Sequence, residues 1–443
     1  MGPVPGVLPA GRGGRTRDRP PAGGHPAYGA ASVTWSEWRM ALEINRRGLP
    51  VDVDLCRAAL RLHEQARGQL LDEIRSITGL SNPNSNAQLT HWLATRGVKV
   101  PNLQAATIDA MLRVPERYPE PVIRVLQCKR KAAMTAPTKW KAYLAKVSPD
   151  GRLRHMFQHR GASRTGREAS RGINLQNLKR PILKTGEQAA ALIRHGLLED
   201  FRLLGLDPIE VLASSVRAGI AAPEGRVLDV ADLSNIESRV VGWLTDCRFI
   251  LDTYRSGKDL YKVMGAEIYH KPYDEITKKE RHFSKPVVLA GPYGQGANGL
   301  VDYADSMGVS LSFEEADAHV KLFRSRCPEI CDRKHGLWGF LEKAIFSAIR
   351  HGQVSRGFRL TIWCEHDYLV IRLPSGRCLF YHQPRVEKKR TPWGEMRDTF
   401  TYMGWNSDAY KWTRLNTHRG GVTENIIQTI ARDVLYHWIR EAF

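Results

Sequence analysis

An acidic residue directly follows an apolar run within VLDVADLSNIESRVVGWL, residues 227–244. The length and valine content of RVLDVA, residues 226–231, predict a buried strand, which places Asp232 where that strand ends. A carboxylate in such a position is desolvated and needs a partner, most simply a cation. Magnesium is commonly held by one or two carboxylates together with substrate phosphates. Asp232 is therefore a candidate metal ligand.

The residues behind Asp232 also have a purely structural interpretation. Ser234 and Glu237 match the S-x-x-E pattern of a capping box, which predicts a helix over residues 235–245. Ser234 would then accept a hydrogen bond from a backbone N–H, and Glu237 would reach back to the cap. This interpretation explains both residues but leaves Asp232 without a role.

A second group of residues recurs at helical spacing in RHFSKPVVLAGPYGQG. Arg281, Lys285, Leu289 and Tyr293 are four residues apart, so on a helix they form one slowly drifting stripe. Such a stripe could hold a triphosphate, a sugar and a base in turn, because Arg grips phosphate oxygens as a fork and Lys acts as a mobile charge and proton donor. A basic surface helix that stops at a Gly-rich segment is the competing interpretation.

A third segment, GASRTGREASRGINLQNLKRP at residues 161–181, has almost no apolar periodicity. Its cations are interleaved with small and amide residues: Arg164, Arg167, Arg171, Lys179 and Arg180. Either a solvated loop or close contact with a phosphate backbone explains this composition.

Two further patterns favour structure over chemistry. Glu365-His366-Asp367 precedes a predicted strand and is interpreted as a polar turn rather than a metal site. Cys327 and Cys331 are not followed by a second pair, so reduced structural thiols are expected rather than zinc.

The composition indicates an anionic partner. The chain has 443 residues, with 66 Lys and Arg against 46 Asp and Glu and a net charge of +20, which suits nucleic acid or an acidic surface. Apolar stretches of about 18 residues are absent from the sequence, so no membrane partner is expected. Residues 1–34 are rich in Gly, Pro and Arg and predict a basic disordered tail.

Five segments, in this order and spacing, resemble family A DNA polymerases, particularly the phage-type replicative branch: TGREASRGINLQNL, DLSNIESRV, the R-x3-K-x3-L-x3-YG stripe, LPSGR and ENIIQTIARD. The resemblance extends from about Trp35 to Phe443. It implies an α+β right-hand fold of thumb, palm and fingers, rich in helix, with an antiparallel palm sheet. The implied divisions are a helical thumb-like region (35–160), a first palm part (161–250), fingers (251–357) and a second palm part (358–443).

The resemblance also implies roles for individual residues in nucleotide addition. Asp232 would be a ligand of two catalytic Mg²⁺ ions, with the Leu233 carbonyl beside it, and Glu237 would be a steric gate against ribonucleotides. Arg281 and Lys285 would bind the incoming phosphates. The implied sugar and template contacts are Leu289, where many relatives carry Phe or Tyr, and Tyr293. The implied DNA contacts are Arg164, Arg167, Asn174, Gln176, Asn177, Asn425 and Gln428.

The expected partners are therefore primer–template DNA and dNTPs, in the cytoplasm of a bacterial or phage-infected cell. The family's second metal carboxylate lies on a hairpin shortly after the final helix, in motif C, and this sequence ends at Phe443. We therefore expect a core truncated before motif C, inactive alone or completed by a separate chain that supplies that motif. A non-catalytic DNA-binding remnant is the alternative, and Glu237 disfavours an RNA polymerase of the same superfamily.

Overall fold

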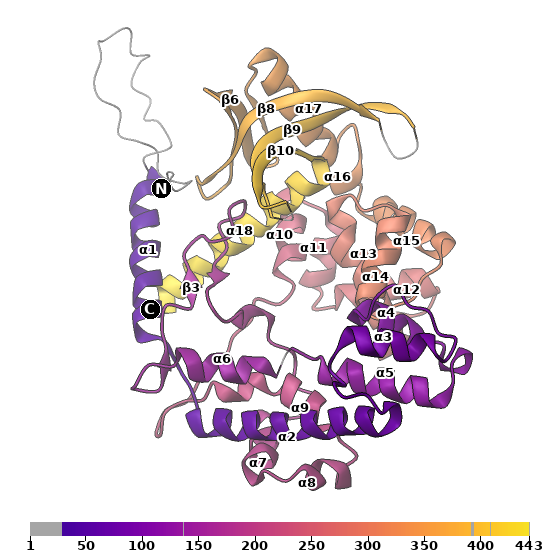
Figure 1. Ribbon diagram of the computed structural model, residues 1–443. Helices are drawn as coiled ribbons and strands as arrows, with labels where there is room; N and C mark the ends of the chain where they lie inside the picture. The colour runs from indigo at the N-terminus through magenta and orange to yellow at the C-terminus, as the bar shows by residue number, and fades with distance from the viewer. Residues whose placement is uncertain (1–28, 136, 391–393, 408, 443) are drawn as a thin grey trace.

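The computed structural model describes residues 29–135, 137–390, 394–407 and 409–442, which form three groups of elements (Figure 1). The lower helical group spans residues 53–219, the second helical group spans residues 236–331, and a sheet with two long helices spans residues 337–442. The lower group contains two hydrophobic clusters of its own, whereas the other two groups share one continuous core. The sheet and the second helical group therefore pack as one unit.

The lower helical group is built on one long helix that begins and ends at recognisable caps. Asp52 accepts a hydrogen bond from the Leu55 amide at 2.8 Å, and the helix ends at Gly79, where φ is 70°. Trp140 lies fully buried against it and donates to the Leu212 carbonyl at 3.0 Å. Helix α1 (Gly29–Arg47) precedes this group. The helices of the group are α2 (Val53–Thr78), α3 (Asn86–Ala94), α4 (Ala105–Leu112), α5 (Glu120–Ala132), α6 (Thr138–Lys146), α7 (Gly186–His195), α8 (Leu198–Leu203) and α9 (Pro208–Ser214).

Short strands and turns connect these helices. The two small antiparallel sheets pair β1 (Leu49–Pro50) with β2 (Arg152–Leu153) and β3 (Phe157–Gln158) with β4 (Ala169–Ser170). The 3-10 turns are η1 (Pro115–Arg117), η2 (Leu175–Asn177) and η3 (Val216–Gly219). Of the predicted disordered tail at residues 1–34, residues 1–28 lie outside the described part of the chain. Residues 29–34 are not a tail but the beginning of helix α1.

The second helical group carries the predicted cationic stripe. Its main helix begins at a capping box between Thr277 and Glu280 and continues through Pro286 to Ala290, and a 3-10 turn follows from Gly291. The elements are α10 (Ile236–Thr245), α11 (Arg248–Arg255), α12 (Leu260–Tyr269), η4 (Tyr273–Glu275), α13 (Lys278–Ala290), η5 (Gly291–Tyr293), α14 (Ala297–Ser306), α15 (Phe313–Arg326) and α16 (Pro328–Cys331).

A six-stranded antiparallel sheet has the order β10-β9-β8-β7-β6-β5. Pro374-Ser375-Gly376 form the hairpin turn that joins β7 to β8, and the Leu373 amide donates to the Arg377 carbonyl at 2.8 Å across that turn. The strands are β5 (Ser355–Gly357), β6 (Leu360–Glu365), β7 (Tyr368–Arg372), β8 (Cys378–Arg390), β9 (Met396–Asn406) and β10 (Lys411–Thr417).

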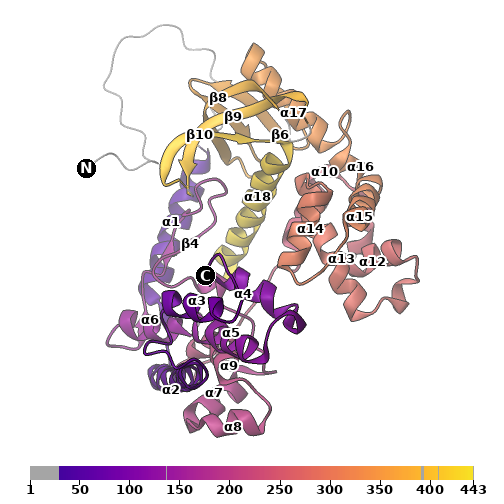
Figure 2. The same cartoon turned by 45° about the vertical axis from the view of Figure 1, so that its right-hand side comes forward.

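Two helices complete this unit, α17 (Leu337–His351) and α18 (Arg419–Ala442). Helix α17 contacts β6 and β8, and α18 contacts α10, α17 and η5. Figures 1 and 2 both show α18 running from the sheet toward the lower helical group. None of the described helices is long and apolar enough to cross a bilayer.

The predicted buried strand at residues 226–231 is wrong. The segment has no strand partner among the described residues, and Val227 and Val230 are 81% and 91% exposed. Its valine content predicts a strand because branched side chains favour pleated backbone. Burial, however, requires neighbouring strands, which local composition does not reveal. Asp232 is consequently exposed rather than desolvated.

Candidate active site

A cavity of about 690 Å³ lies where α10, η5 and α18 meet. These elements are far apart in the sequence, so the cavity exists only in the folded chain. Its lining includes five of the predicted site residues: Leu233, Glu237, Leu289, Tyr293 and Gln428. The folded chain therefore brings together the residues predicted as the steric gate (Glu237), a template contact (Tyr293) and a DNA contact (Gln428).

Glu237 and Tyr293 bond to each other within this cavity. The Tyr293 hydroxyl donates to the Glu237 carboxylate, and burial, reinforced by that carboxylate, raises the pKa of Tyr293. The phenol therefore stays protonated and remains the donor. The predicted capping box is wrong, because Asn235 is the N-cap with φ of 53° and makes no side-chain cap bond. Instead of capping the start of α10, the Glu237 carboxylate accepts a hydrogen bond from Tyr293, which lies 56 positions away in the sequence.

Glu424, which is not among the predicted site residues, also lines the cavity. Gln428 donates to Glu424 at 3.1 Å along α18. Partial burial, followed by the charge of Glu237, raises the pKa of Glu424, while the Arg167 guanidinium opposes that rise. Glu424 and Gln428 are four residues apart on a helix and so share a face. That spacing is the signal that could have identified Glu424.

Arg281 and Lys285 lie on successive turns of α13 beside Tyr261, another lining residue. The guanidinium and ammonium groups are 5.1 and 5.8 Å from the centre of the Tyr261 ring. Arg281 Nε donates to Asp259 at 2.7 Å. Burial, followed by the charges of Arg281 and Arg180, lowers the pKa of Lys285. Arg281 and Lys285 are not in the cavity lining themselves, but they lie beside Tyr261, which is. Arg180 belongs to the basic segment of residues 161–181, which we call the basic loop, and its charge acts on Lys285.

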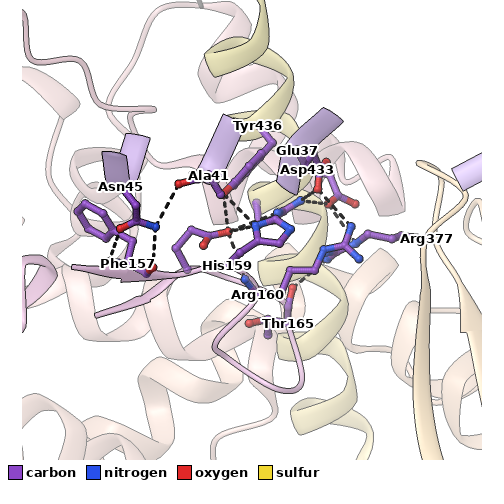
Figure 3. Close-up of polar contacts among 12 residues, drawn as sticks. Glu37, Ala41, Asn45, Phe157, His159, Arg160, Thr165, Arg377, Asp433 and Tyr436 are labelled. Carbon is purple, nitrogen blue, oxygen red and sulfur yellow. Dashed lines mark hydrogen bonds and ion pairs between the residues drawn. The ribbon is translucent and has the colours of Figure 1, made fainter. Parts of the chain in front are cut away.

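A buried ionic cluster joins α18 to α1 and to the basic loop (Figure 3). We define it as Glu37, His159, Glu168, Arg432 and Tyr436. Arg432 pairs with Glu37 at 2.6 Å and with Glu168 at 3.4 Å. Glu168 also meets His159 Nδ1 at 3.0 Å and accepts from the Tyr436 hydroxyl. Burial alone would raise the pKa of Glu168, but its hydrogen bonds to His159 and Tyr436 lower it, so the charged form is favoured.

Arg167 lies in the sequence between Thr165 and Glu168, two residues that are held by contacts to other parts of the protein. Arg377 donates to the Thr165 carbonyl at 2.9 Å and pairs with Asp433 of α18 at 3.1 Å. On the other side of Arg167, Glu168 belongs to the buried ionic cluster. Because both neighbours are fixed, the exposed Arg167 side chain extends from a firmly held turn.

Two other predicted DNA contacts pack against the sheet. The Arg164 guanidinium lies 4.0 Å from the centre of the Tyr402 ring. Asn425 donates to the Tyr381 hydroxyl at 3.1 Å. Both side chains therefore already have partners within the protein.

The three amide residues of the basic loop lie around η2. Asn174 caps it by accepting from the Asn177 amide at 3.2 Å. Gln176 Nε2 lies 3.5 Å from the Glu168 carbonyl, and the Asn177 carbonyl accepts from Lys139 at 3.2 Å. These contacts connect η2 to the buried ionic cluster and to α6.

Asp232 is exposed and directly precedes Leu233, which lines the cavity. Within the described ranges, no group of three or more His, Cys, Asp or Glu side chains is arranged to hold a metal. A carboxylate and a neighbouring carbonyl are hard oxygen donors that suit Mg²⁺ when phosphates supply further ligands. The Asp232 carboxylate and the Leu233 carbonyl are therefore suitable oxygen ligands for Mg²⁺, but they supply only one of the carboxylates that such a site can use.

The other two patterns occupy a turn and the hydrophobic core. Glu365 is the last residue of β6, and His366 and Asp367 form the turn between β6 and β7. All seven cysteines are free, and Cys327 and Cys331 lie in the core shared by the sheet and the second helical group.

The profile described as "DNA polymerase family A" matches residues 54–363. The chain belongs to that family. It is 34% identical to the DNA polymerase of Bacillus phage SP02 over 401 residues, which are 90% of this chain and 60% of that protein. It is 27% identical to DNA polymerase I of Aquifex aeolicus (strain VF5), over 62% of this chain and 42% of that one.

The fold agrees with this assignment. The "POL domain of Pol1 from M. smegmatis complex with DNA primer-template and dNTP" superposes with a TM-score of 0.56 and 18% identity, covering 91% of this chain and 58% of that one. The predicted α+β polymerase fold is confirmed. The chain spans about 60% of the phage relative's length.

Proposed function

We propose that the chain is a template-directed DNA polymerase core that adds dNTPs to a primer 3′-hydroxyl. The observation that carries the proposal is the cavity at which Glu237, Tyr293 and Gln428 meet beside the cations of α13. A nucleotide requires positive charge for its phosphates, a wall against its sugar and a surface for its base. Glu237, Leu289 and Tyr293 line one cavity of about 690 Å³, and Arg281 and Lys285 lie beside Tyr261 of its lining, which supports the assignment of these roles. The proposed regions are the thumb (35–160), palm (161–250 and 358–443) and fingers (251–357).

Arg281 and Lys285 would bind the triphosphate. The Arg281 guanidinium pairs with Asp259, so phosphate oxygens would replace that carboxylate as its partner. Guanidinium groups bind phosphate as a two-pronged fork. Lys285, whose pKa is lowered by burial and neighbouring cations, releases a proton more readily than a free lysine. It is therefore suited to protonate the departing pyrophosphate.

Glu237 would exclude ribonucleotides. Its carboxylate is held by the Tyr293 hydroxyl, so it cannot easily move aside for an added 2′-hydroxyl. Leu289 would present an aliphatic surface to the sugar in place of an aromatic ring. Tyr293 would lie next to the templating base.

Two Mg²⁺ ions are the proposed cofactor, with Asp232 and the Leu233 carbonyl as ligands. When bound, the metals would supply Lewis-acid activation of the 3′-hydroxyl and stabilise the leaving oxygens. The chain's own residues position the nucleotide, exclude the ribose hydroxyl and deliver the proton.

Primer–template DNA would bind along the turn that carries Arg167 and along α18. Arg167 and Gln428 would approach the primer end, with Arg164, Asn425 and η2 supporting that surface. The solved polymerase domain with a similar fold, which is a complex with DNA primer–template and dNTP, supports this choice of ligands. Such a protein would act in the cytoplasm of a bacterial or phage-infected cell.

Primer extension with Mg²⁺ and dNTPs tests the proposal. Asp232→Ala should abolish extension, whereas Asp229→Ala, an exposed carboxylate on the same segment, should leave it unchanged. Equal activity of the two variants would refute the metal assignment. Loss of activity in both would show that the segment, rather than the Asp232 carboxylate, is what matters.

The second candidate function is DNA binding without catalysis by this chain alone, either as a remnant or as one subunit of a split polymerase. The exposed segment at residues 226–230, which has no strand partner in the described part of the chain, favours it. A separate chain could pair with that segment and supply a second metal carboxylate. This candidate predicts salt-dependent duplex binding without extension, and extension that appears only when the complementing chain is added.

A further inference from the structure

The six-stranded sheet has one covered face and one face turned away from the helices. Side chains alternate between the two faces of a strand, and Ile362, Ile371 and Leu379 are paired in register and belong to the shared core. Helix α17 contacts the same strands. The neighbouring positions, such as Phe380 and Trp363, must therefore point to the opposite side, which we call the outer face.

Aromatic rings form a continuous row across the outer face. The Tyr368 ring lies 6.0 Å from Phe380 and 5.0 Å from His382, measured between ring centres. His382 lies 6.3 Å from Trp412, which is paired in register with Trp405. Phe380, Trp405 and Trp412 are 61%, 52% and 49% exposed. Because these rings bury so little of their surface, packing within the sheet does not explain why aromatic residues occupy these positions.

Cations accompany these rings. Arg414 follows Trp412 by two positions and so shares its face, and its guanidinium is held by the Gln383 carbonyl at 3.1 Å and the Thr401 hydroxyl at 3.2 Å. Arg372 follows Tyr368 by four positions on β7, again on the outer face. Exposed rings flanked by fixed positive charge complement a polyanion that also offers flat, apolar surfaces.

We propose that the outer face binds single-stranded DNA by stacking unpaired bases on Phe380, Trp405 and Trp412. Aromatic side chains stack on any base, while neighbouring cations attract the phosphates, so such platforms tolerate all sequences. A duplex keeps its bases stacked internally and offers mainly phosphate oxygens, so it gains little from the rings. The face lies across the sheet from the core side, and the site is therefore distinct from the candidate active site.

The test uses a fluorescein-labelled oligothymidylate of about 16 nucleotides, within the range bound by such platforms. Each lost stack should weaken binding about tenfold, so the paired change Trp405→Ala and Trp412→Ala should weaken it about a hundredfold. Phe380→Ala tests the same face by itself. Phe313→Ala is the matched control, because Phe313 is 52% exposed at the start of α15, outside the six-stranded sheet.

An abasic oligonucleotide of equal length separates stacking from phosphate attraction. It should bind the wild-type chain more weakly, and the substitutions should not change its affinity. An equal loss for both oligonucleotides, or unchanged oligothymidylate binding by Phe380→Ala and by the paired variant, would overturn the proposal. Quenching of tryptophan fluorescence by oligothymidylate should also shrink in the paired variant, and an undiminished quench would count against it.

A second copy of the chain is the other occupant that the experiment distinguishes. It would appear as concentration-dependent sedimentation that the paired variant abolishes while oligothymidylate affinity stays unchanged, and this result would also overturn the proposal. Primer extension by Phe380→Ala on a short template should remain at the wild-type level. Single-stranded DNA binding by the outer face and polymerase activity are measured separately, so either proposal can be refuted without the other.

Discussion

Replacing Arg432 by methionine should severely destabilise the protein. The Arg432 side chain is 2% exposed, pairs with Glu37 at 2.6 Å and Glu168 at 3.4 Å, and lies 3.6 Å from the centre of the Tyr436 ring. Methionine keeps much of the apolar stem but removes the Arg432 cation from Glu168, and it leaves Arg160, at 3.1 Å, as the remaining arginine partner of Glu37. Removing one partner of a buried ion pair costs about 3–5 kcal/mol, a large part of the roughly 5–15 kcal/mol by which proteins of this kind are stable.

The assay is the free energy of unfolding from urea denaturation. Arg440→Met, on the exposed part of the same helix, should change it by less than about 0.5 kcal/mol. Adding Glu168→Gln to Arg432→Met should restore part of the loss, because the carboxylate that has lost its Arg432 partner is then removed as well. A loss below about 1 kcal/mol for Arg432→Met, or strictly additive effects in the double variant, would refute the reasoning.

The same substitution should also affect DNA binding. Glu168 is adjacent to Arg167, so loosening the buried ionic cluster should release the turn that presents Arg167. We expect Arg432→Lys, which keeps the charge but not the fork, to retain more duplex affinity than Arg432→Met. Equal affinity of the two variants and the wild type would show that the cluster does not position Arg167.

Three further predictions concern separate parts of the molecule. Arg167→Ala should weaken duplex binding about tenfold and reduce its salt dependence by about one counterion, whereas Arg61→Ala on the exposed side of α2 should not. Glu237→Ala should raise ribonucleotide incorporation about 10- to 100-fold relative to dNTPs, measured as the ratio of kcat/KM values. Glu280 is held by Lys271, which with the α13 cap lowers its pKa from 4.5 to about 2. A depressed folded-state pKa gives stability that is present above about pH 4.5 and lost as the pH falls toward 2, so Glu280→Gln should flatten the fall in Tm over that interval.

Local rules in the sequence determine several features correctly. Gly48 and Pro50 interrupt helical backbone, and α1 indeed ends at Arg47 before α2 begins at Val53. Pro374-Ser375-Gly376 predicts a hairpin, which joins β7 to β8. Each signal depends on the conformational limits of a few neighbouring residues, and these limits hold in any context.

The family and the general fold were also predictable, because five short segments occur in the order and spacing typical of family A polymerases. Spacing along α13 likewise predicts one stripe for Arg281 and Lys285, and both lie beside Tyr261. A helix repeats every 3.6 residues, so which side chains share its face can be read from the sequence.

Only the tertiary structure decided which partners these residues meet. Glu237 fits a capping box locally, yet it bonds to Tyr293, 56 positions away, and Arg432 pairs with Glu37 across 395 positions. Residues 226–231 carry the composition of a buried strand, but burial depends on strands beside them. Such contacts arise when distant segments are brought together by packing of the whole core, and spacing within one segment contains no information about them.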